Sequence, residues 1–151
     1  MIEALLMAHV LFGVACLLAA LWVFVDVLHA SAGNLVRIRA VSWLGAASMW
    51  IAFFVGGYWY VTFYKADKAI ILQGPWHFAH NMVMETKEHV VIMLLLLATF
   101  LPIAAMDNLA TSNDARRLVL WVAAMVAVLA LAMDGEGGII AMGVKVGLLS
   151  K

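Results

Sequence analysis

Residues 4–28, ALLMAHVLFGVACLLAALWVFVDVL, form an apolar run with one charged side chain, Asp26, close to its end. A helix needs about 20 such residues to cross the roughly 30 Å hydrocarbon layer of a bilayer. Three further runs reach or approach this length: residues 40–64, 83–106 and 118–133. The sequence therefore predicts four transmembrane helices.

The composition of the chain excludes an ordinary soluble domain. Of its 151 residues, 67% are hydrophobic and 12% are charged, and the mean hydropathy is +1.06; soluble domains carry about 25% charged residues. A core of this size cannot bury the excess of apolar side chains, so lipid is the expected solvent. The formal net charge of zero argues against a nucleic-acid partner. The single cysteine, Cys16, excludes an internal disulfide and a C-x-x-C-H haem attachment.

Short connections join the four runs, for example SAGNLVRIR (31–39) and DNLATSNDARR (107–117). Short loops make sequential helices antiparallel. We therefore expect an all-α fold, an integral membrane up-down four-helix bundle in which residues 1–151 form a single transmembrane domain. Pro75 predicts the start of the third helix in the interface. The glycine-rich GEGGIIAMG (135–143) predicts close helix packing followed by a short interfacial tail.

The positive charges nearly balance across the predicted membrane. The even number of spans places both termini and the central connection on one face, and the two outer connections on the other. We assign the arginine side to the cytoplasm because its charges lie close to the span ends. The expected location is thus the inner membrane of a bacterium, with periplasmic termini. The charges compared are Arg37, Arg39, Arg116 and Arg117 on one side, and Lys65, Lys68, Lys145 and Lys151 on the other.

Four of the five histidines are predicted on the face that carries the termini. His9 lies early in the first span, and His77, His80 and His89 lie around the start of the third. At 1.5 Å per residue, His9 is about 28 Å from the far end of its helix and His89 about 26 Å from the far end of its own. A polar side chain at such depth is costly unless it pairs or binds something. We therefore expect these two imidazoles to face each other.

Two facing imidazoles at membrane depth are typical of bis-histidine haem b ligation. His9 and His89 are the predicted axial ligands, and Gly13, one turn from His9, would leave space for the porphyrin edge. His77 and His80 lie nearer to water, where they are candidates for a second metal site, for a haem propionate or for proton relay. Two simpler interpretations stay open: that His9 only packs or hydrogen-bonds, and that His77 and His80 belong to a solvated interfacial segment.

Two segments resemble known membrane families. AHVLFGVACLLAALWVFVDVLHA (8–30) and GPWHFAHNMVMETKEHVVIMLLLLATF (74–100) resemble the haem-binding membrane protoporphyrinogen oxidases and related copper-resistance membrane proteins. Those families pair a histidine early in the first helix with a lysine or histidine at the start of the third. The resemblance implies that His9 is linked to haem and that Lys87 binds the cofactor, and is catalytic in an oxidase. The fourth span departs from the oxidase pattern because it lacks an Asn-Glu-Pro-type start.

The last segment, AMDGEGGIIAMGVKVG (132–147), is instead similar to small four-helix bacterial membrane proteins of unassigned function. Taken together, the residues predict a b-type cytochrome that exchanges electrons with quinone or a partner redox subunit, as a homo- or hetero-oligomer in the bilayer. One alternative is a haem-dependent enzyme that oxidises protoporphyrinogen. Another is a copper-handling protein, because imidazole and thioether ligands suit Cu(I); its candidate ligands are His77, His80, Met82 and Met84. A structural subunit whose histidines only hydrogen-bond also stays open.

Overall fold

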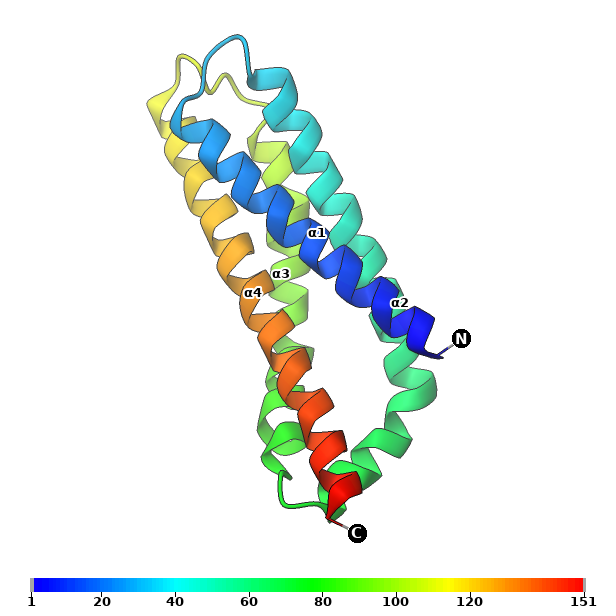
Figure 1. Cartoon of the computed structure of the whole chain (residues 1–151). Coiled ribbons are helices and arrows are strands. Elements are labelled where there is room, and N and C mark those ends of the chain that lie inside the picture. Colours follow the sequence, from blue (N-terminus) through cyan, green and yellow to red (C-terminus); the bar gives the residue numbers. More distant parts are fainter. Residues whose placement is uncertain (1, 151) are drawn as a thin grey trace.

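The computed structural model describes residues 2–150 and consists of four long helices joined by short turns (Figure 1). Met1 and Lys151, one of the lysines compared for orientation, lie outside the described residues. No strand occurs between residues 2 and 150, so the predicted all-helical class is confirmed. The elements are α1 (Ile2–Leu28), α2 (Leu35–Gln73), the π-helical segment η1 (Ala79–Met84), α3 (Glu85–Ala104) and α4 (Asn113–Leu149).

The four helices are long and apolar enough to cross a membrane, when η1 is counted with α3. Their outward faces carry large apolar side chains, and Leu18, Leu96 and Val128 are each more than half exposed. An apolar surface that extends along every helix is unfavourable in water. The chain therefore has the features of a multi-pass membrane protein whose outer surface contacts lipid.

Two helices extend well beyond the predicted spans. Helix α2 has 39 residues and ends at Gln73, and α4 has 37 residues and ends at Leu149. The predicted interfacial tail after the glycines is helical instead, because the glycines allow α4 to pack against other elements. A methyl group added at Gly143 would lie 2.8 Å from Cβ of Ala79, and one at Gly147 would lie 2.7 Å from the carbonyl oxygen of Ile70. This close packing offsets the low helix propensity of glycine.

The turn between α2 and η1 is fixed by Gly74 and Pro75. A residue before proline is restricted to extended backbone, and Gly74 has φ −92° and ψ 177°. A methyl group at Gly74 would lie 2.7 Å from Cα of Gly147, so the turn rests directly on α4. The π-helix begins at Ala79 rather than at Pro75, the predicted start of the third helix.

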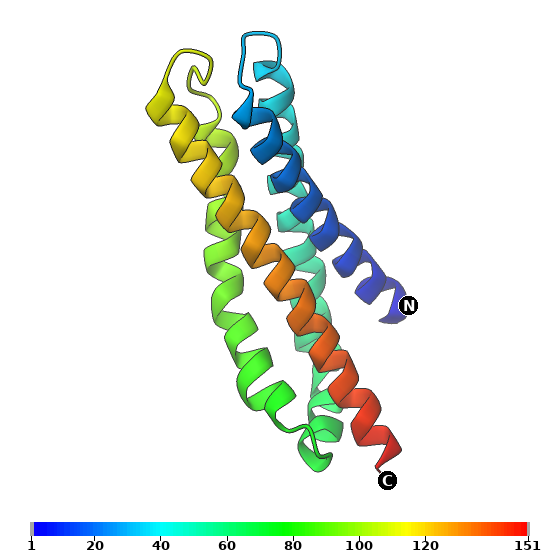
Figure 2. The same ribbon diagram turned by 60° about the vertical axis from the view of Figure 1, so that its left-hand side comes forward.

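Neighbouring helices run antiparallel, and α1 packs against α2 and α4 (Figures 1 and 2). Beyond the N-terminus of α1, the bundle continues with α2, η1 and α4 (Figure 1). The main core includes the fully buried Val23, Val27, Ile38 and Val119. A second, smaller core lies at the other end and consists of Tyr64, Ile71, Ala79, Val83, Met84 and Ile140.

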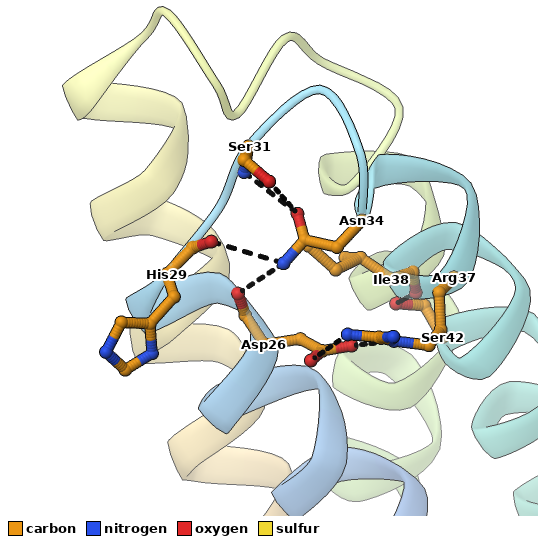
Figure 3. Close-up of polar contacts among 7 residues, drawn as sticks. All are labelled: Asp26, His29, Ser31, Asn34, Arg37, Ile38 and Ser42. Carbon is orange, nitrogen blue, oxygen red and sulfur yellow. Dashed lines mark hydrogen bonds and ion pairs between the residues drawn. The ribbon is translucent and has the colours of Figure 1, made fainter.

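The end of the bundle that carries the α1–α2 and α3–α4 connections, here called the arginine end, is held by paired polar groups. Arg37 donates two hydrogen bonds to the carboxylate of Asp26, from Nε at 2.7 Å and from a terminal nitrogen at 2.8 Å (Figure 3). The side-chain amide of Asn34 donates to the carbonyl oxygens of Asp26 and His29. The ring of His29 points away from this network (Figure 3).

Two further arginines fasten the same end. Arg39 donates to the carbonyl oxygens of Ala105 at 3.1 Å and Met106 at 2.9 Å, which follow α3. Arg116 of α4 donates to the carbonyl oxygen of Ala30 at 3.1 Å. These carbonyls lie at helix ends, where backbone acceptors lack partners within the helix. The arginines therefore connect all four helices through groups that would otherwise be unpaired.

Candidate functional site

Four ionisable side chains of three helices gather at the opposite end of the membrane-spanning part: His9, Lys87, Asp134 and Glu136, here called the polar cluster. Three of them lie over a glycine of a neighbouring helix. A methyl group at Gly56 would lie 2.5 Å from Nδ1 of His9, one at Gly13 3.1 Å from Oδ1 of Asp134, and one at Gly137 3.1 Å from Nζ of Lys87. The glycines thus provide the space that these side chains occupy between helices.

The imidazole of His9 has a defined orientation. Its Nδ1 lies 2.9 Å from the carbonyl oxygen of Ala52 on α2. A carbonyl oxygen can only accept a hydrogen bond, so Nδ1 is the donor, and Nε2 of the neutral ring keeps its lone pair. Histidines that bind metals are commonly oriented in this way, through a hydrogen bond from the nitrogen that does not bind the metal.

Lys87 brings a positive charge to the same region. Its Nζ donates to the carbonyl oxygen of Met133 at 3.0 Å, and the carboxylates whose charge acts on it are Glu136 and Asp134. Asp134 also acts on His9. Between residues 2 and 150 the only ion pair closer than 4 Å is that of Asp26 and Arg37, so these attractions act at longer range. One carboxylate oxygen of Glu136 is buried without a hydrogen-bond partner in the described part of the chain.

The members of the polar cluster lie at a similar depth. His9 is about 26 Å along α1 from Asp26, Lys87 about 26 Å along α3 from its end at Ala104, and Asp134 about 27 Å along α4 from Arg116, at 1.5 Å per residue. The hydrocarbon layer is about 30 Å thick. With the arginine end at one boundary, the polar cluster lies just inside the opposite one.

The structure brings together three of the predicted site residues and separates the others. His9, Gly13 and Lys87 all belong to the polar cluster or line it. His89 is exposed on the outer face of α3, where its Nδ1 donates to the carbonyl oxygen of Glu85 in its own helix at 2.6 Å. His9 and His89 thus bond to different helices, and the predicted face-to-face arrangement of their rings is not present. Bis-histidine ligation of a haem stays a prediction.

The other two predicted histidines occupy different environments. His77 is exposed, whereas His80 is 5% exposed and lies in η1. Nδ1 of His80 is 3.0 Å from the hydroxyl of Tyr64, which is buried in α2. No group of three or more His, Cys, Asp or Glu side chains in the described range is arranged to hold a metal ion. A shared metal site of His77 and His80 therefore gains no support from their positions.

Several site residues were not predicted from the sequence. Asp134 and Glu136 follow directly after the predicted fourth span, but their approach to Lys87 depends on how α3 packs against α4. The role of Gly56 was not foreseen because a single glycine in an apolar helix is no signal by itself. The sequence signal that could have identified Asp134 and Glu136 is their position near the end of a span, since charged residues inside a membrane usually mark a functional site.

The polar cluster combines groups with distinct chemistry: a free imidazole nitrogen, an ammonium group and two carboxylates. The imidazole nitrogen can bind a transition metal, and the ammonium group can pair with a carboxylate or phosphate of a ligand. Comparisons with protein-family models, with curated proteins and with solved structures found no match for this chain. The candidate function therefore follows from the site and from the resemblance noted in the sequence.

Proposed function

We propose that the chain is a b-type cytochrome of a bacterial inner membrane, in which Nε2 of His9 would bind the haem iron and Lys87 would pair with a haem carboxylate. One observation carries this proposal: His9 and Lys87, from different helices, converge inside the bundle while the hydrogen bond to Ala52 leaves Nε2 of His9 available. Bound haem would supply reversible one-electron transfer at its iron.

The residues around the polar cluster fit this assignment in part. Ala52 fixes the orientation of the His9 ring, and Lys87 offers the positive charge that a propionate requires. The carboxylates of Asp134 and Glu136 compete for that charge. His89 is exposed on α3 and bonds within its own helix, so binding of the haem iron by a second histidine is a separate prediction, tested by His89→Ala.

The proposal is tested by absorption spectroscopy of the full chain, purified in detergent from cells supplied with haem precursor, first oxidised and then reduced with dithionite. We expect a Soret band in the wild type and at least a tenfold lower haem content in His9→Ala. His29→Ala is the matched control, because that ring lies at the arginine end and points away from the hydrogen-bonded network drawn in Figure 3. A lower haem content in His89→Ala would indicate that both histidines bind the haem iron, and an unchanged content would indicate that His9 binds it without His89.

Two results would overturn the proposal. The first is a colourless wild type after haem supplementation. The second is a His9→Ala variant with the haem content and spectrum of the wild type. Circular dichroism and size-exclusion chromatography of each variant distinguish loss of haem from loss of the fold.

A second candidate function is the oxidation of protoporphyrinogen. Its support is the position of Lys87, half-buried beside His9, where an ammonium group would hold a carboxylate of the substrate. Growth of a strain that lacks its own oxidase tests it: the wild-type chain should restore growth and Lys87→Met should not. Failure of the wild type to restore growth, with haem still bound, leaves electron transfer as the function.

Copper handling stays a third prediction, with less support from the site. His80 is buried against Tyr64, whereas His77 and Met82 are exposed, so the predicted soft ligands do not lie in one environment. Elemental analysis of protein purified without added metal distinguishes copper from iron. We also propose periplasmic termini and assembly with a second copy or a partner redox subunit, which cysteine accessibility scanning and cross-linking in membranes would test.

A further inference from the structure

A group of aromatic side chains lies on the far side of Gly56 from the membrane centre. Trp59, Tyr60 and Tyr64 come from α2, and His80 comes from η1. The rings of Tyr60 and Tyr64 stack with centroids 5.1 Å apart, and the ring of Tyr64 is 5.8 Å from those of both Trp59 and His80. Tyr64 belongs to the smaller core, and Trp59 and Tyr60 pack against that core.

Two polar atoms of this aromatic group lack a partner. Nε1 of Trp59 is buried without a hydrogen-bond acceptor among residues 2–150. Nε2 of the buried His80 makes no hydrogen bond to the described residues, since its contact with Tyr64 uses Nδ1. A buried donor without an acceptor costs about 1–3 kcal/mol, and such groups are rare in folded proteins. The unpaired indole N–H therefore indicates an acceptor from outside the chain.

The chemistry of the surroundings restricts that acceptor. The charges that act on Tyr60 and Tyr64 are the carboxylates of Glu88, Glu85 and Asp67. Carboxylates repel an anionic ligand such as a phosphate or a carboxylate. Stacked aromatic rings favour a planar ring of the ligand, and an N–H donor requires a hydrogen-bond acceptor on it, for which a carbonyl oxygen is suited. A neutral, planar ring with carbonyl oxygens satisfies these conditions.

The position in the molecule adds a further restriction. Trp59 lies one turn beyond Gly56, which contacts His9 near the hydrocarbon boundary. Helix α1 begins at Ile2, about two turns beyond His9, and α2, η1 and α4 continue past its N-terminus (Figure 1). The adjacent outer surface carries the exposed apolar side chains of Val61 and Phe78 together with the exposed polar side chains of Lys65 and Glu85. A π-helical turn such as η1 is often found at functional sites. A lipid-soluble ligand would reach this region from the membrane.

We propose that Trp59, Tyr60, Tyr64 and His80 bind the head group of a membrane quinone, with the indole N–H of Trp59 donating to one of its carbonyl oxygens. When the hydroxyl of Tyr64 donates to Nδ1 of His80, Nε2–H of His80 is a second donor at the same site. Binding does not depend on haem. If the proposed cytochrome function is correct, this site names the quinone as its electron partner.

The test is equilibrium binding of decylubiquinone, and of a short-tailed menaquinone, to the haem-free full chain in lipid nanodiscs. Trp59→Phe keeps the ring but removes the donor, and we expect its dissociation constant to rise about five- to tenfold, as for one hydrogen bond. Trp121→Phe is the matched control, because Trp121 is 72% exposed on α4 and should bind as the wild type does. Tyr64→Phe, which frees Nδ1 of His80, should also weaken binding.

Three results would overturn the quinone site: no saturable binding by the wild type, equal affinities of Trp59→Phe and wild type, or equal weakening by Trp59→Phe and Trp121→Phe. Tetramethylammonium is included because aromatic rings beside carboxylates can also hold a quaternary cation. If tetramethylammonium competes with quinone, and Trp59→Phe does not change the affinity for quinone, the site would be assigned to a cation instead. If quinone binds to a chain that shows no Soret band after haem supplementation, the quinone proposal is supported and the haem proposal fails.

Discussion

The two ends of the bundle contain similar types of side chain but pair them differently. At the arginine end, Asp26 receives both hydrogen bonds of Arg37, and Arg39 and Arg116 donate to backbone carbonyls. At the opposite end, the charges of the polar cluster attract one another without a direct ion pair, and Glu136 and Trp59 keep unpaired buried atoms. Buried polar groups without a partner are rare in folded proteins and call for an explanation. The two ends thus differ in how far their polar groups are paired within the chain, and the end with unpaired buried atoms is the one at which we propose ligand binding.

The largest effect is expected from Lys87→Met. This change removes the positive charge that acts on Asp134 and Glu136 and leaves two carboxylates between helices without a cation. We expect the free energy of unfolding to fall by about 2–3 kcal/mol, somewhat less than for a fully buried pair. Thermal unfolding in detergent measures it, and Lys68→Met, an exposed lysine on α2, is the control. Equal unfolding temperatures for Lys87→Met and Lys68→Met would show that the charge of Lys87 does not stabilise the carboxylates of Asp134 and Glu136.

A pair of glycines tests the contact of His9 with α2 more specifically. In Gly56→Ala the new methyl group would lie 2.5 Å from the His9 ring, whereas one at the neighbouring Gly57 would meet nothing within 4 Å. We expect Gly56→Ala to lose about 1–2 kcal/mol of stability through overpacking, and to lose haem if the proposed function is correct. Gly57→Ala should gain about 0.5–1 kcal/mol, because alanine favours a helix. The same sign for both variants would contradict the packing of His9 against Gly56.

The arginine end provides the opposite case. Arg116→Met removes the hydrogen bonds to the carbonyl oxygens of Ala30 and Leu109, and we expect a loss of about 1 kcal/mol. The content of any bound haem per folded protein and the affinity for quinone should stay as in the wild type. A loss of ligand binding by a folded Arg116→Met variant would contradict the division of roles between the two ends.

The smallest effect is expected at the start of α4. The hydroxyl of Ser112 accepts a hydrogen bond from the backbone N–H of Ala115 at 3.2 Å, as an N-cap residue. Ser112→Ala should lower stability by about 0.5–1 kcal/mol, and Ser112→Asp should restore it because aspartate is also a good N-cap. Equal unfolding temperatures for all three proteins would place this helix end outside the cooperative unfolding unit.

Some of the candidate site was accessible from the sequence. His9 and Lys87 were recognised because ionisable residues in an apolar chain attract attention, and because the resemblance named the histidine and the lysine. Gly13 was predicted to leave space for a porphyrin edge, whereas in the structure the carboxylate of Asp134 lies over it. His89 was matched to His9 by depth alone. Depth along a helix follows from residue count, but the direction of a side chain depends on the rotation of its helix, and α3 turns His89 outward.

The apolar runs by themselves determined that the chain is helical and has four segments able to span a membrane, because backbone polar groups in lipid must be satisfied within each helix. Their short connections determined the antiparallel order. Only the tertiary structure decided where the polar side chains lie. His9 lies over Gly56 and Lys87 lies over Gly137, in each case across a helix interface. The tertiary structure also decided that α4 continues through its glycines, because the partners that stabilise that region, Ala79 and Ile70, are remote in sequence. Local patterns specify the elements, whereas rotation and contact between helices depend on packing of the whole bundle.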